Sequence, residues 1–368
     1  MKWFVSSLLL ILLITGVNAR VWNVNVDCLS DTITNGDSEN IDVAFAYASA
    51  GDVIKIDSGV YYYSVQNTID TTSWYFLKIV DDDIRIEGSG DVIIDCENQS
   101  FALYGAYADS IYIEGITFRN CYDWSEGAVN QYGVAFDLYS GDSWTIKNNI
   151  FYNNTVEDSL AVGQEIRGGL IYVGRWSIFE NNVFDSNAIY DYGYGDTITG
   201  FIYCDYQVDF IGNVFKNNII ENRSEIQKSI NGIVYYKRAF SSSYWFDNAF
   251  YDNIALNHNA MSGAVAFVYQ ENYQGLTDKL YGDSNIALNN YYFDEFFHNS
   301  DDTDVLLIPS LNKVNWLAID IYANPEKDFK LLWLAIDLYD LFPYIQEILE
   351  KTEQRNYLNH TLIRRRFR

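Results

Sequence analysis

Basic residues are scarce in this chain of 368 residues, and their scarcity limits what the protein can bind. Lysine and arginine number 24 against 50 aspartates and glutamates, so the formal net charge is −26. Such an acidic surface disfavours nucleic acid, whose phosphates need basic contacts. It also disfavours direct binding of a polyanionic glycan, unless a cation such as calcium bridges the two surfaces. We therefore expect no resident cofactor, and a neutral, cationic or calcium-bridged partner.

Proline, histidine and closely spaced cysteines are also rare. The three prolines suit long stacks of hydrogen-bonded strands, because proline cannot donate to a strand ladder. The sequence contains no CxxC pair of the kind that indicates a zinc site. The three histidines fall at no shared position of the repeats described below. Tyrosine, in contrast, occurs 31 times and is favoured in strands.

The first residues have the features of a secretory signal. Lys2 provides the charged start, Trp3–Ile14 is apolar, and Val17–Ala19 resembles a cleavage site of small residues. A membrane anchor is the alternative, but the apolar run is shorter than the roughly 20 residues that cross a bilayer. We therefore predict a secreted or cell-surface protein without an integral membrane span in the mature chain.

A phenylalanine followed three residues later by an asparagine recurs through the middle of the chain. Ser143–Asn154, SWTIKNNIFYNN, has this form, and a looser early copy ends on Cys121 instead. Successive phenylalanines are 33, 33, 31 and 35 residues apart, and a period of about 20–50 residues indicates stacked repeats. The repeated residues are Phe118, Phe151, Phe184, Phe215 and Phe250, with Asn154, Asn187, Asn218 and Asn253.

A second motif, a glycine followed by a short apolar run, alternates with the first. Gly169–Tyr172 and Gly200–Tyr203 are examples. Each period therefore holds at least two short strands, and no helical pattern separates them. Strands that stack on the same strands of the next coil, about 4.8 Å away, satisfy this pattern. The sequence thus predicts an all-β fold, a parallel β-helix or solenoid.

Both motifs have a structural interpretation. A phenylalanine that repeats once per coil can point inward and stack on its equivalents. An asparagine at the following turn can bond the same amide one coil away. Glycine allows a tight bend or a close backbone approach. We therefore expect these residues to hold the fold together rather than to act on a ligand.

The start of the repeat region resembles a known superfamily. A short helix expected over Glu39–Ala50 precedes Gly51–Ile56 and Gly59–Tyr62, a pattern similar to the opening of pectin-lyase-like domains. Ile84–Gly88 and Ile111–Gly115 repeat a further phrase of that superfamily. The later FxxN and glycine motifs resemble polymorphic outer membrane protein repeats. The resemblance implies a right-handed parallel β-helix with an N-terminal cap.

Three segments follow from these patterns. We predict a signal peptide at residues 1–19, a β-helix at residues 20–300, and a capping segment with a basic tail at residues 301–368. The last segment has helical spacing at Phe329–Phe342 and ends on the basic run Arg364–Arg368. It is therefore expected to be helical.

Cysteines and sequons are candidate modification sites in a secreted protein. Cys96 and Cys121 could lie on neighbouring coils and form a disulfide, or could be small buried apolar residues. Asn222 is the preferred glycosylation site, because the polar run around it suggests an outward loop, and Asn153 is the least favoured. The four acceptor sequons begin at Asn98, Asn153, Asn222 and Asn359.

Three tryptophans suggest a ladder along the coils. Trp144 and Trp176 fall at similar places in successive repeats, and Trp245 falls close to them. Exposed, they would form a platform for glycans; buried, they would belong to the core. We favour at least partial burial.

The resemblance also implies an alternative function, that of a polysaccharide lyase or glycoside hydrolase. A hydrolase needs two carboxylates about 5–10 Å apart, and the candidate catalytic residues are Asp205, Asp209 and Asp247. Each also suits a solvated turn. The catalytic phrases of polygalacturonase-like enzymes are absent, and Lys237–Arg238 is most simply an outward edge charge. We therefore predict a secreted or surface non-catalytic repeat protein, adhesive or structural, that binds an extracellular glycan or protein.

Overall fold

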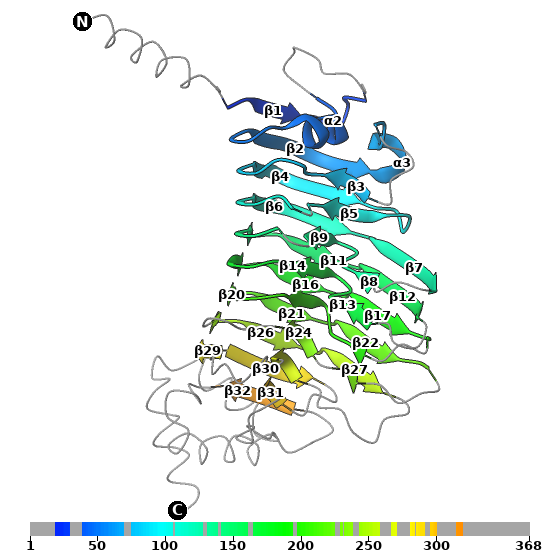
Figure 1. The fold of residues 1–368 in the computed structure, drawn as a ribbon, viewed down its shortest axis with the longest axis vertical. Coiled ribbons are helices and arrows are strands. Elements are labelled where there is room, and N and C mark those ends of the chain that lie inside the picture. The colour runs from blue at the N-terminus through cyan, green and yellow to red at the C-terminus, as the bar shows by residue number, and fades with distance from the viewer. Residues whose placement is uncertain are drawn as a thin grey trace, which may run out of the picture.

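The protein is a parallel β-solenoid. The computed structural model describes residues 19–29, 39–69, 75–105, 107–127, 131–138, 141–160, 165–193, 197–224, 229–230, 232–237, 243–257, 266–270, 280–283, 285–290, 295–299 and 314–318. Short strands of one coil pair in parallel with the corresponding strands of the next, and the coils succeed one another along the long axis of the molecule (Figure 1). The predicted all-β parallel architecture is confirmed, whereas its right-handed winding remains a prediction.

The first two columns of strands form the longest sheet. They meet at β6 (Tyr112–Arg119), whose two halves pair with β10 and β11. Column one contains β10 (Thr145–Lys147), β15 (Ser177–Glu180), β20 (Val208–Ile211), β25 (Ser243–Phe246) and β29 (Leu280–Asp283). Column two contains β11 (Ile150–Tyr152), β16 (Val183–Asp185), β21 (Val214–Lys216), β26 (Ala249–Tyr251) and β30 (Asn285–Asn290).

Three further columns complete the coils. Column three contains β7 (Tyr122–Gly127), β12 (Thr155–Leu160), β17 (Ala188–Asp191), β22 (Ile219–Asn222) and β27 (Ile254–Asn257). Column four contains β8 (Gln131–Tyr132), β13 (Glu165–Arg167), β18 (Thr197–Ile198) and β23 (Ser229–Ile230). Column five contains β3 (Tyr75–Lys78), β5 (Phe101–Tyr104), β9 (Phe136–Leu138), β14 (Ile171–Val173), β19 (Ile202–Cys204), β24 (Gly232–Tyr236), β28 (Ala266–Gln270) and β31 (Glu295–Asn299).

The N-terminal coils use longer strands and include a helix. Strands β1 (Val21–Val24), β2 (Val53–Tyr62) and β4 (Arg85–Asp95) lead in parallel pairings to β6. Helix α2 (Ile41–Tyr47) lies beside β1, and a second short helix, α3 (Tyr63–Gln66), follows β2 (Figure 1). The Asn40 side chain caps α2 by accepting the Asp42 N–H, as an N-cap asparagine does.

The expected helix over residues 39–50 therefore forms, over a shorter span. It buries an apolar side that includes Val43 and Phe45. Its role as an N-terminal cap remains a prediction.

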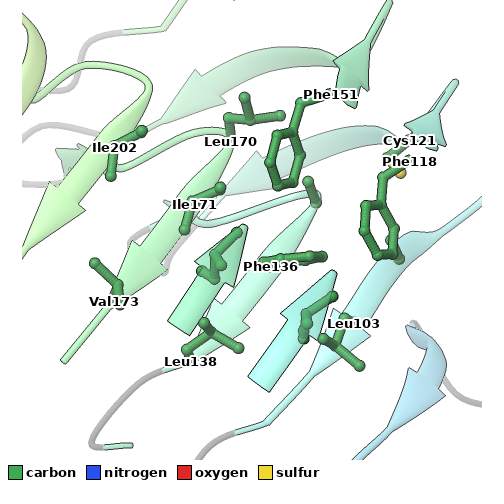
Figure 2. Close-up of a cluster of buried hydrophobic side chains, with 14 of the residues drawn as sticks. Leu103, Phe118, Cys121, Phe136, Leu138, Phe151, Leu170, Ile171, Val173 and Ile202 are labelled. Carbon is green, nitrogen blue, oxygen red and sulfur yellow. The ribbon is translucent and has the colours of Figure 1, made fainter. Parts of the chain in front are cut away.

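Five phenylalanines form one stacked column in the core. The rings of Phe151 and Phe184 lie 4.8 Å apart with planes 5° from parallel, and the same arrangement continues to Phe215 and Phe250. Phe118 begins the column, and Phe136 of β9 meets it edge-on from the opposite side of the core (Figure 2). All five side chains of the column are at most 1% exposed, so the repeat period is the length of one coil.

An asparagine ladder runs beside the phenylalanines. Asn187 Nδ2 donates to Asn218 Oδ1 in the next coil at 3.0 Å and to the Phe151 carbonyl in the previous coil at 3.0 Å. Its Oδ1 accepts the Asn154 N–H at 3.1 Å. Each buried amide is thus satisfied on both sides, as burial of polar groups requires. Asn253 continues the ladder to Asn290.

A second asparagine ladder lies at the preceding turn. Its first four members stand two residues before stacked phenylalanines, its last stands two residues before Ala287, and all five are almost fully buried. Asn182 Nδ2, for example, donates to Asn213 Oδ1 at 3.0 Å and to the Ile146 carbonyl at 2.7 Å. The ladder consists of Asn149, Asn182, Asn213, Asn248 and Asn285. It separates columns one and two and keeps their turns in register.

The turns before both ladders use the left-handed backbone region. Asn148, Asn153, Asn217 and Asp247 have φ between 53° and 56°. Among non-glycine residues, asparagine and aspartate tolerate this region best. The frequent Asn-Asn and Asp-Asn pairs in the repeats therefore combine a turn residue with a ladder residue.

The glycine motif precedes column five. Gly168 has φ of 58°, and a Cβ atom there would lie 2.2 Å from the Ile171 carbonyl oxygen. A Cβ on Gly133 would lie 2.1 Å from the Phe136 carbonyl oxygen. The backbone doubles back so closely at these positions that only glycine fits.

The three tryptophans are not equivalent. Trp144 precedes Thr145, which pairs with Ile178, so its counterpart in the next coil is Ser177 and not Trp176. Trp245 pairs with Phe210, a core position. Trp144 and Trp245 are fully buried, whereas Trp176 is 57% exposed. The expected tryptophan ladder is therefore wrong: Trp144 and Trp245 are buried, as favoured, whereas Trp176 is exposed.

The predicted C-terminal segment lies largely outside the described residues. Within it the structure describes β32 (Val314–Ala318), which pairs antiparallel with β30. The helical spacing expected at Phe329–Phe342 and the basic tail fall outside the described parts. Among the described residues, no helix is long and apolar enough to cross a membrane.

Candidate functional site

The outward side of columns one and two forms an extended surface, which we call the long face. Side chains alternate along each strand, so Thr145 and Lys147 point outward while Ile146 is buried between them. The same alternation in β6, β15, β20 and β25 places outward residues in rows along the solenoid. Adjacent members of a row come from neighbouring coils.

The N-terminal half of the long face carries a network of polar side chains. Glu114 lies at its centre and accepts hydrogen bonds from Tyr112 Oη at 2.5 Å and Asn148 Nδ2 at 2.8 Å. The Arg85 guanidinium lies 3.9 Å from the centre of the Tyr112 ring and 3.7 Å from Glu114. Lys147 Nζ pairs with Glu180 Oε1 at 2.9 Å. We call these six residues the polar network.

These contacts fix the protonation of the polar network. The hydrogen bond from Tyr112 holds the pKa of Glu114 below its ordinary value, although partial burial opposes this effect. The hydrogen bond from Asn148 and the charges of Lys147 and Arg85 lower this pKa further. Burial raises the pKa of Tyr112, and its bond to Glu114 adds to the rise. Glu114 is thus an ionised acceptor and Tyr112 a neutral donor near neutral pH.

The C-terminal half of the long face is apolar and aromatic. Tyr244 and Phe246 project from β25, are 40% and 37% exposed, and stack with ring centres 6.0 Å apart. In the same two rows, Ile211 lies one coil from Phe246 and Ile178 lies two coils from Tyr244; both isoleucines are half-buried. Planar rings beside aliphatic side chains provide rigid contact area at low entropic cost.

Arg175 and Trp176 stand at the turn that leads into column one. Arg175 Nε pairs with Asp142 Oδ2 at 2.9 Å, and its backbone N–H donates to Asp142 Oδ1 at 2.9 Å. The guanidinium carbon lies 5.1 Å from the ring centre of Trp176 and 5.1 Å from that of Tyr206. These residues form a corner in which an arginine, anchored by an aspartate, lies near two aromatic rings.

The three candidate catalytic aspartates occupy different kinds of position. Asp209 lies in β20 on the long face, where it accepts the Tyr244 N–H at 3.0 Å and a hydrogen bond from the Gln207 side chain. Burial raises its pKa despite these bonds. Asp205 follows β19, and Asp247 is exposed on the turn between β25 and β26. Since a general acid needs a raised pKa, Asp209 is the strongest catalytic candidate of the three.

The cationic pair and the histidines add little to this face. Lys237 follows β24 and donates its N–H to the Cys204 carbonyl at 3.0 Å, whereas Arg238 lies outside the described residues. His258 and His360 lie outside them too. Across the described parts of the chain, no group of three or more His, Cys, Asp or Glu side chains could hold a metal ion.

A second polar cluster lies on the outward side of column three. Arg223 stacks 3.9 Å from the centre of the Tyr190 ring, bonds Tyr192 Oη, and pairs with Glu221 at 2.6 Å. Tyr122 Oη donates to Glu157 at 3.2 Å nearby. Sequence reasoning missed this cluster and the polar network, since each draws its members from several coils.

Cys96 and Cys121 come together at the start of the asparagine ladder. Their sulfur atoms lie 2.7 Å apart, both are fully buried, and both are free thiols. The Cys121 N–H donates to Asn154 Oδ1 at 2.9 Å, so this cysteine replaces the first ladder asparagine. The disulfide remains a prediction.

The sequons are placed differently from the expected order. Asn222 is fully buried in β22, so its interpretation as an outward loop residue is wrong. Asn98 and Asn153 are exposed on turns. Asn359 lies outside the described residues.

Comparison with known proteins gives a match in structure but none in sequence. No family model matches the chain, and no curated protein sequence matches it significantly. Among solved structures, one described as "Rhamnogalacturonan lyase" is similar in fold, with a TM-score of 0.38 and 11% identity, over 83% of this chain and 98% of that chain. The solenoid assignment rests on the parallel register of this chain's own strands, and the likeness to polymorphic outer membrane protein repeats remains a prediction.

Proposed function

We propose that this protein is a secreted or cell-surface binding module that holds an extracellular glycan on its long face without cleaving it. Secretion follows from the predicted signal at residues 1–19. The fold offers a rigid, elongated surface, and repeat architectures commonly bind partners along such surfaces. The observation that carries the proposal is the pairing of aromatic residues with a charge-balanced network on one face.

Charge balance makes the long face suitable for binding within an acidic protein. Arg85 and Lys147 contribute two positive charges, and Glu87, Glu114 and Glu180 contribute three negative ones, a sum of −1. The whole chain carries −26. A partner approaching these five residues therefore meets a net charge close to zero, and their paired side chains present ordered donors and acceptors to sugar hydroxyls.

The aromatic half would supply the contact area. Tyr244, Phe246 and Trp176 are exposed, and aromatic faces stack on apolar surfaces of a ligand. The ionised state of Glu114 favours hydrogen-bond acceptance over proton donation, since a general acid must carry a proton at working pH.

A second candidate function, glycan cleavage, is favoured by one observation. Asp209 combines a raised pKa with a position on the long face beside Tyr244. If the protein is an enzyme, this residue is the general acid, and its replacement by asparagine abolishes turnover.

Binding and cleavage can be separated in one set of measurements. The purified mature chain is incubated with pectic, alginate-like and neutral glycans, with and without calcium. Binding is measured on immobilised glycans, and cleavage by ultraviolet absorbance of unsaturated products and by new reducing ends. We expect binding without cleavage, weakened by Tyr244→Ala and Phe246→Ala but not by Tyr47→Ala on helix α2, which is 50% exposed.

Turnover would contradict the proposal. Activity that disappears in Asp209→Asn and persists in Asp205→Asn and Asp247→Asn would establish an enzyme whose acid lies on the long face. If Tyr244→Ala and Phe246→Ala bind as well as the parent protein, the ligand lies on another surface.

The proposal retains the segment boundaries predicted above. Residues 20–300 would form the binding solenoid, wound right-handed, with α2 as the N-terminal cap and residues 301–368 as the C-terminal cap. Both caps would shield strand edges that otherwise invite association with other chains.

A further inference from the structure

One edge of the long face is lined by turn residues that follow column two. Asn120, Asn153, Ser186 and Asn217 occupy this edge in successive coils, all with φ between 53° and 57°. Each donates its backbone N–H to a carbonyl of the next coil. In the preceding coil Asp95 lies opposite Arg119, so Asn98 lies two residues beyond the position of Asn120, in a longer turn. Its N–H donates to the Asn120 carbonyl at 2.7 Å. We call this line of residues the asparagine edge.

Two residues of the asparagine edge begin acceptor sequons. These are Asn98, followed by Gln99 and Ser100, and Asn153, followed by Asn154 and Thr155. Both asparagines are exposed and have left-handed backbone angles, φ 56° and 53°. The two sites are separated by two coils, so they lie along one line on the molecule.

We infer that Asn98 and Asn153 carry N-linked glycans and that Asn222 does not. In the reaction, the asparagine Nδ2 loses one proton and bonds the anomeric carbon of a lipid-linked oligosaccharide, whose lipid pyrophosphate leaves. The inference rests on the predicted secretory signal and is independent of the ligand-binding function proposed above.

The local contacts of Asn153 are compatible with this modification. Its Nδ2 donates to Asn120 Oδ1 at 2.7 Å. A glycosylated asparagine keeps one N–H on that nitrogen, so it can retain this bond while the sugar projects outward. The ladder residue Asn154 next to it points into the solenoid and is buried, so the neighbouring ladder does not obstruct the acceptor.

Asn222 has the opposite surroundings. It is fully buried, and its Oδ1 accepts the Ser224 N–H at 3.0 Å and the Ser224 hydroxyl at 2.6 Å. A glycan attached here would have to occupy the interior, so a chain modified at Asn222 could not form β22 and the coil around it.

The glycans would leave the proposed binding surface open. The asparagine edge follows column two, whereas Arg175 and Trp176 stand at the turn that precedes column one. Sugars at Asn98 and Asn153 therefore border the long face on the edge away from that corner.

The test expresses the full chain, with its own first 19 residues, in eukaryotic cells that secrete and glycosylate. A parallel version carries a proven secretion leader in their place. Peptide mass mapping of the secreted protein before and after enzymatic deglycosylation should find Asn98 and Asn153 modified and Asn222 unmodified. Asn98→Gln and Asn153→Gln should each remove one glycan, and the double variant both.

A gain-of-site variant provides a matched positive control. Thr155, Ala188 and Ile219 occupy equivalent positions in successive coils, so Ile219→Thr turns Asn217, Asn218 and residue 219 into a copy of the Asn153 sequon. We expect a new glycan at Asn217. Ser224→Ala, which destroys the buried sequon, should leave the glycan pattern unchanged.

Two outcomes would overturn the inference, and a third would separate the sites from the predicted signal. A secreted, folded protein with Asn222 occupied would show that its burial does not hold. A chain unmodified at Asn98 and Asn153, although delivered by the proven leader, would show that the edge is no acceptor. A protein retained inside the cell with its own leader but glycosylated with the proven one would refute the predicted signal while confirming the sites.

Discussion

Phe184 and Phe215 stack face to face, with ring centres 4.5 Å apart and planes 5° from parallel, although 31 residues separate them along the chain. Their strands β16 and β21 pair in parallel with these two residues directly opposite. Each ring covers the next, so the column buries aromatic area continuously through the core. The stability of every coil therefore depends on its neighbours.

Removing one ring from this column should be costly. We expect Phe184→Ala to lower the free energy of unfolding by about 3–5 kcal/mol, because the cavity cannot close between two fixed rings. Tyr152→Ala, on the exposed side of the neighbouring strand β11, should change it by less than about 0.5 kcal/mol. Urea unfolding followed by fluorescence measures both. A loss below about 1 kcal/mol for Phe184→Ala would contradict the stacked core.

The asparagine ladder makes a separate prediction. Asn187→Ala removes the acceptor of the Asn154 N–H and a donor to the Phe151 carbonyl. Asn218 Oδ1 loses one donor but keeps the backbone N–H of residue 187. Each buried unsatisfied group costs about 1–3 kcal/mol, so we expect a loss of at least 2 kcal/mol by that estimate. Asn181→Gly, at an exposed left-handed turn in the same coil, is the control and should be nearly neutral. Similar losses for both variants would argue against a specific ladder contribution.

The spacing of phenylalanine and asparagine made the core register predictable from sequence. A residue that recurs once per coil must occupy one position in every coil, whatever the loops between. The second ladder, two residues before Phe151, Phe184, Phe215 and Phe250, was equally regular. In the first two of these coils it was hidden in Asn-Asn pairs whose first member is a turn residue. Nothing in the spacing alone distinguishes the buried asparagine from the exposed one.

The tryptophans show why approximate spacing fails. Trp144 and Trp176 are 32 residues apart, whereas Ile146 and its partner Phe179 are 33 apart. A shift of one residue moves a side chain to the other face of a strand or into a turn. Trp144 is therefore in the core, and Trp176 is on the surface.

The polar network could not be predicted from the sequence for a related reason. Arg85, Tyr112 and Lys147 come from three coils, and their contact depends on the register of β4, β6 and β10. Charged residues are frequent enough in this chain that no spacing marks these few. Burial and partner geometry, which distinguish Asp209 from Asp205 and Asp247, are likewise properties of the folded chain.

Asp95 should make stability dependent on acid pH. Its side chain is 4% exposed, and this burial acts to raise its pKa. Hydrogen bonds from Asn120, the Glu97 N–H and Arg119 outweigh the effect of burial and lower the pKa below 3.8. A depressed folded-state pKa contributes stability above the unfolded value, and that contribution is lost as the pH falls through the folded value. Unfolding free energies from about pH 6 to about pH 3 should therefore decline less in Asp95→Asn than in the parent protein.

The control for that measurement is Asp252→Asn at an exposed turn, which should keep the parent slope. If Asp95→Asn and the parent lose stability in parallel, the carboxylate is not held ionised by its three donors.

Thiol chemistry should distinguish the cysteines. Burial raises the pKa of Cys121 and of Cys204 well above the usual thiol value, and the thiolate is the reactive form. We expect iodoacetamide to label Cys28, which is partly exposed, and to spare the other three in the folded protein. In denaturant without reductant, Cys204 should become reactive. Cys96 and Cys121 should also react if free, and should stay blocked if the predicted disulfide forms in the secreted protein.

The exposed corner at Trp176 gives the sharpest test of the binding face. Trp176→Asn removes the ring but keeps a residue that tolerates φ of 54°, as Asn148 and Asn153 do in comparable turns. Because Trp176 is 57% exposed, the free energy of unfolding should change by less than about 0.5 kcal/mol. Glycan affinity should fall at least about tenfold, since aromatic anchors commonly carry 1–2 kcal/mol or more of binding energy. Trp144→Phe, in the core, is the converse control: it should lower stability and leave the affinity of the folded protein unchanged. Affinity that survives Trp176→Asn would exclude the corner from the binding site and confine the ligand to the rows around Tyr244.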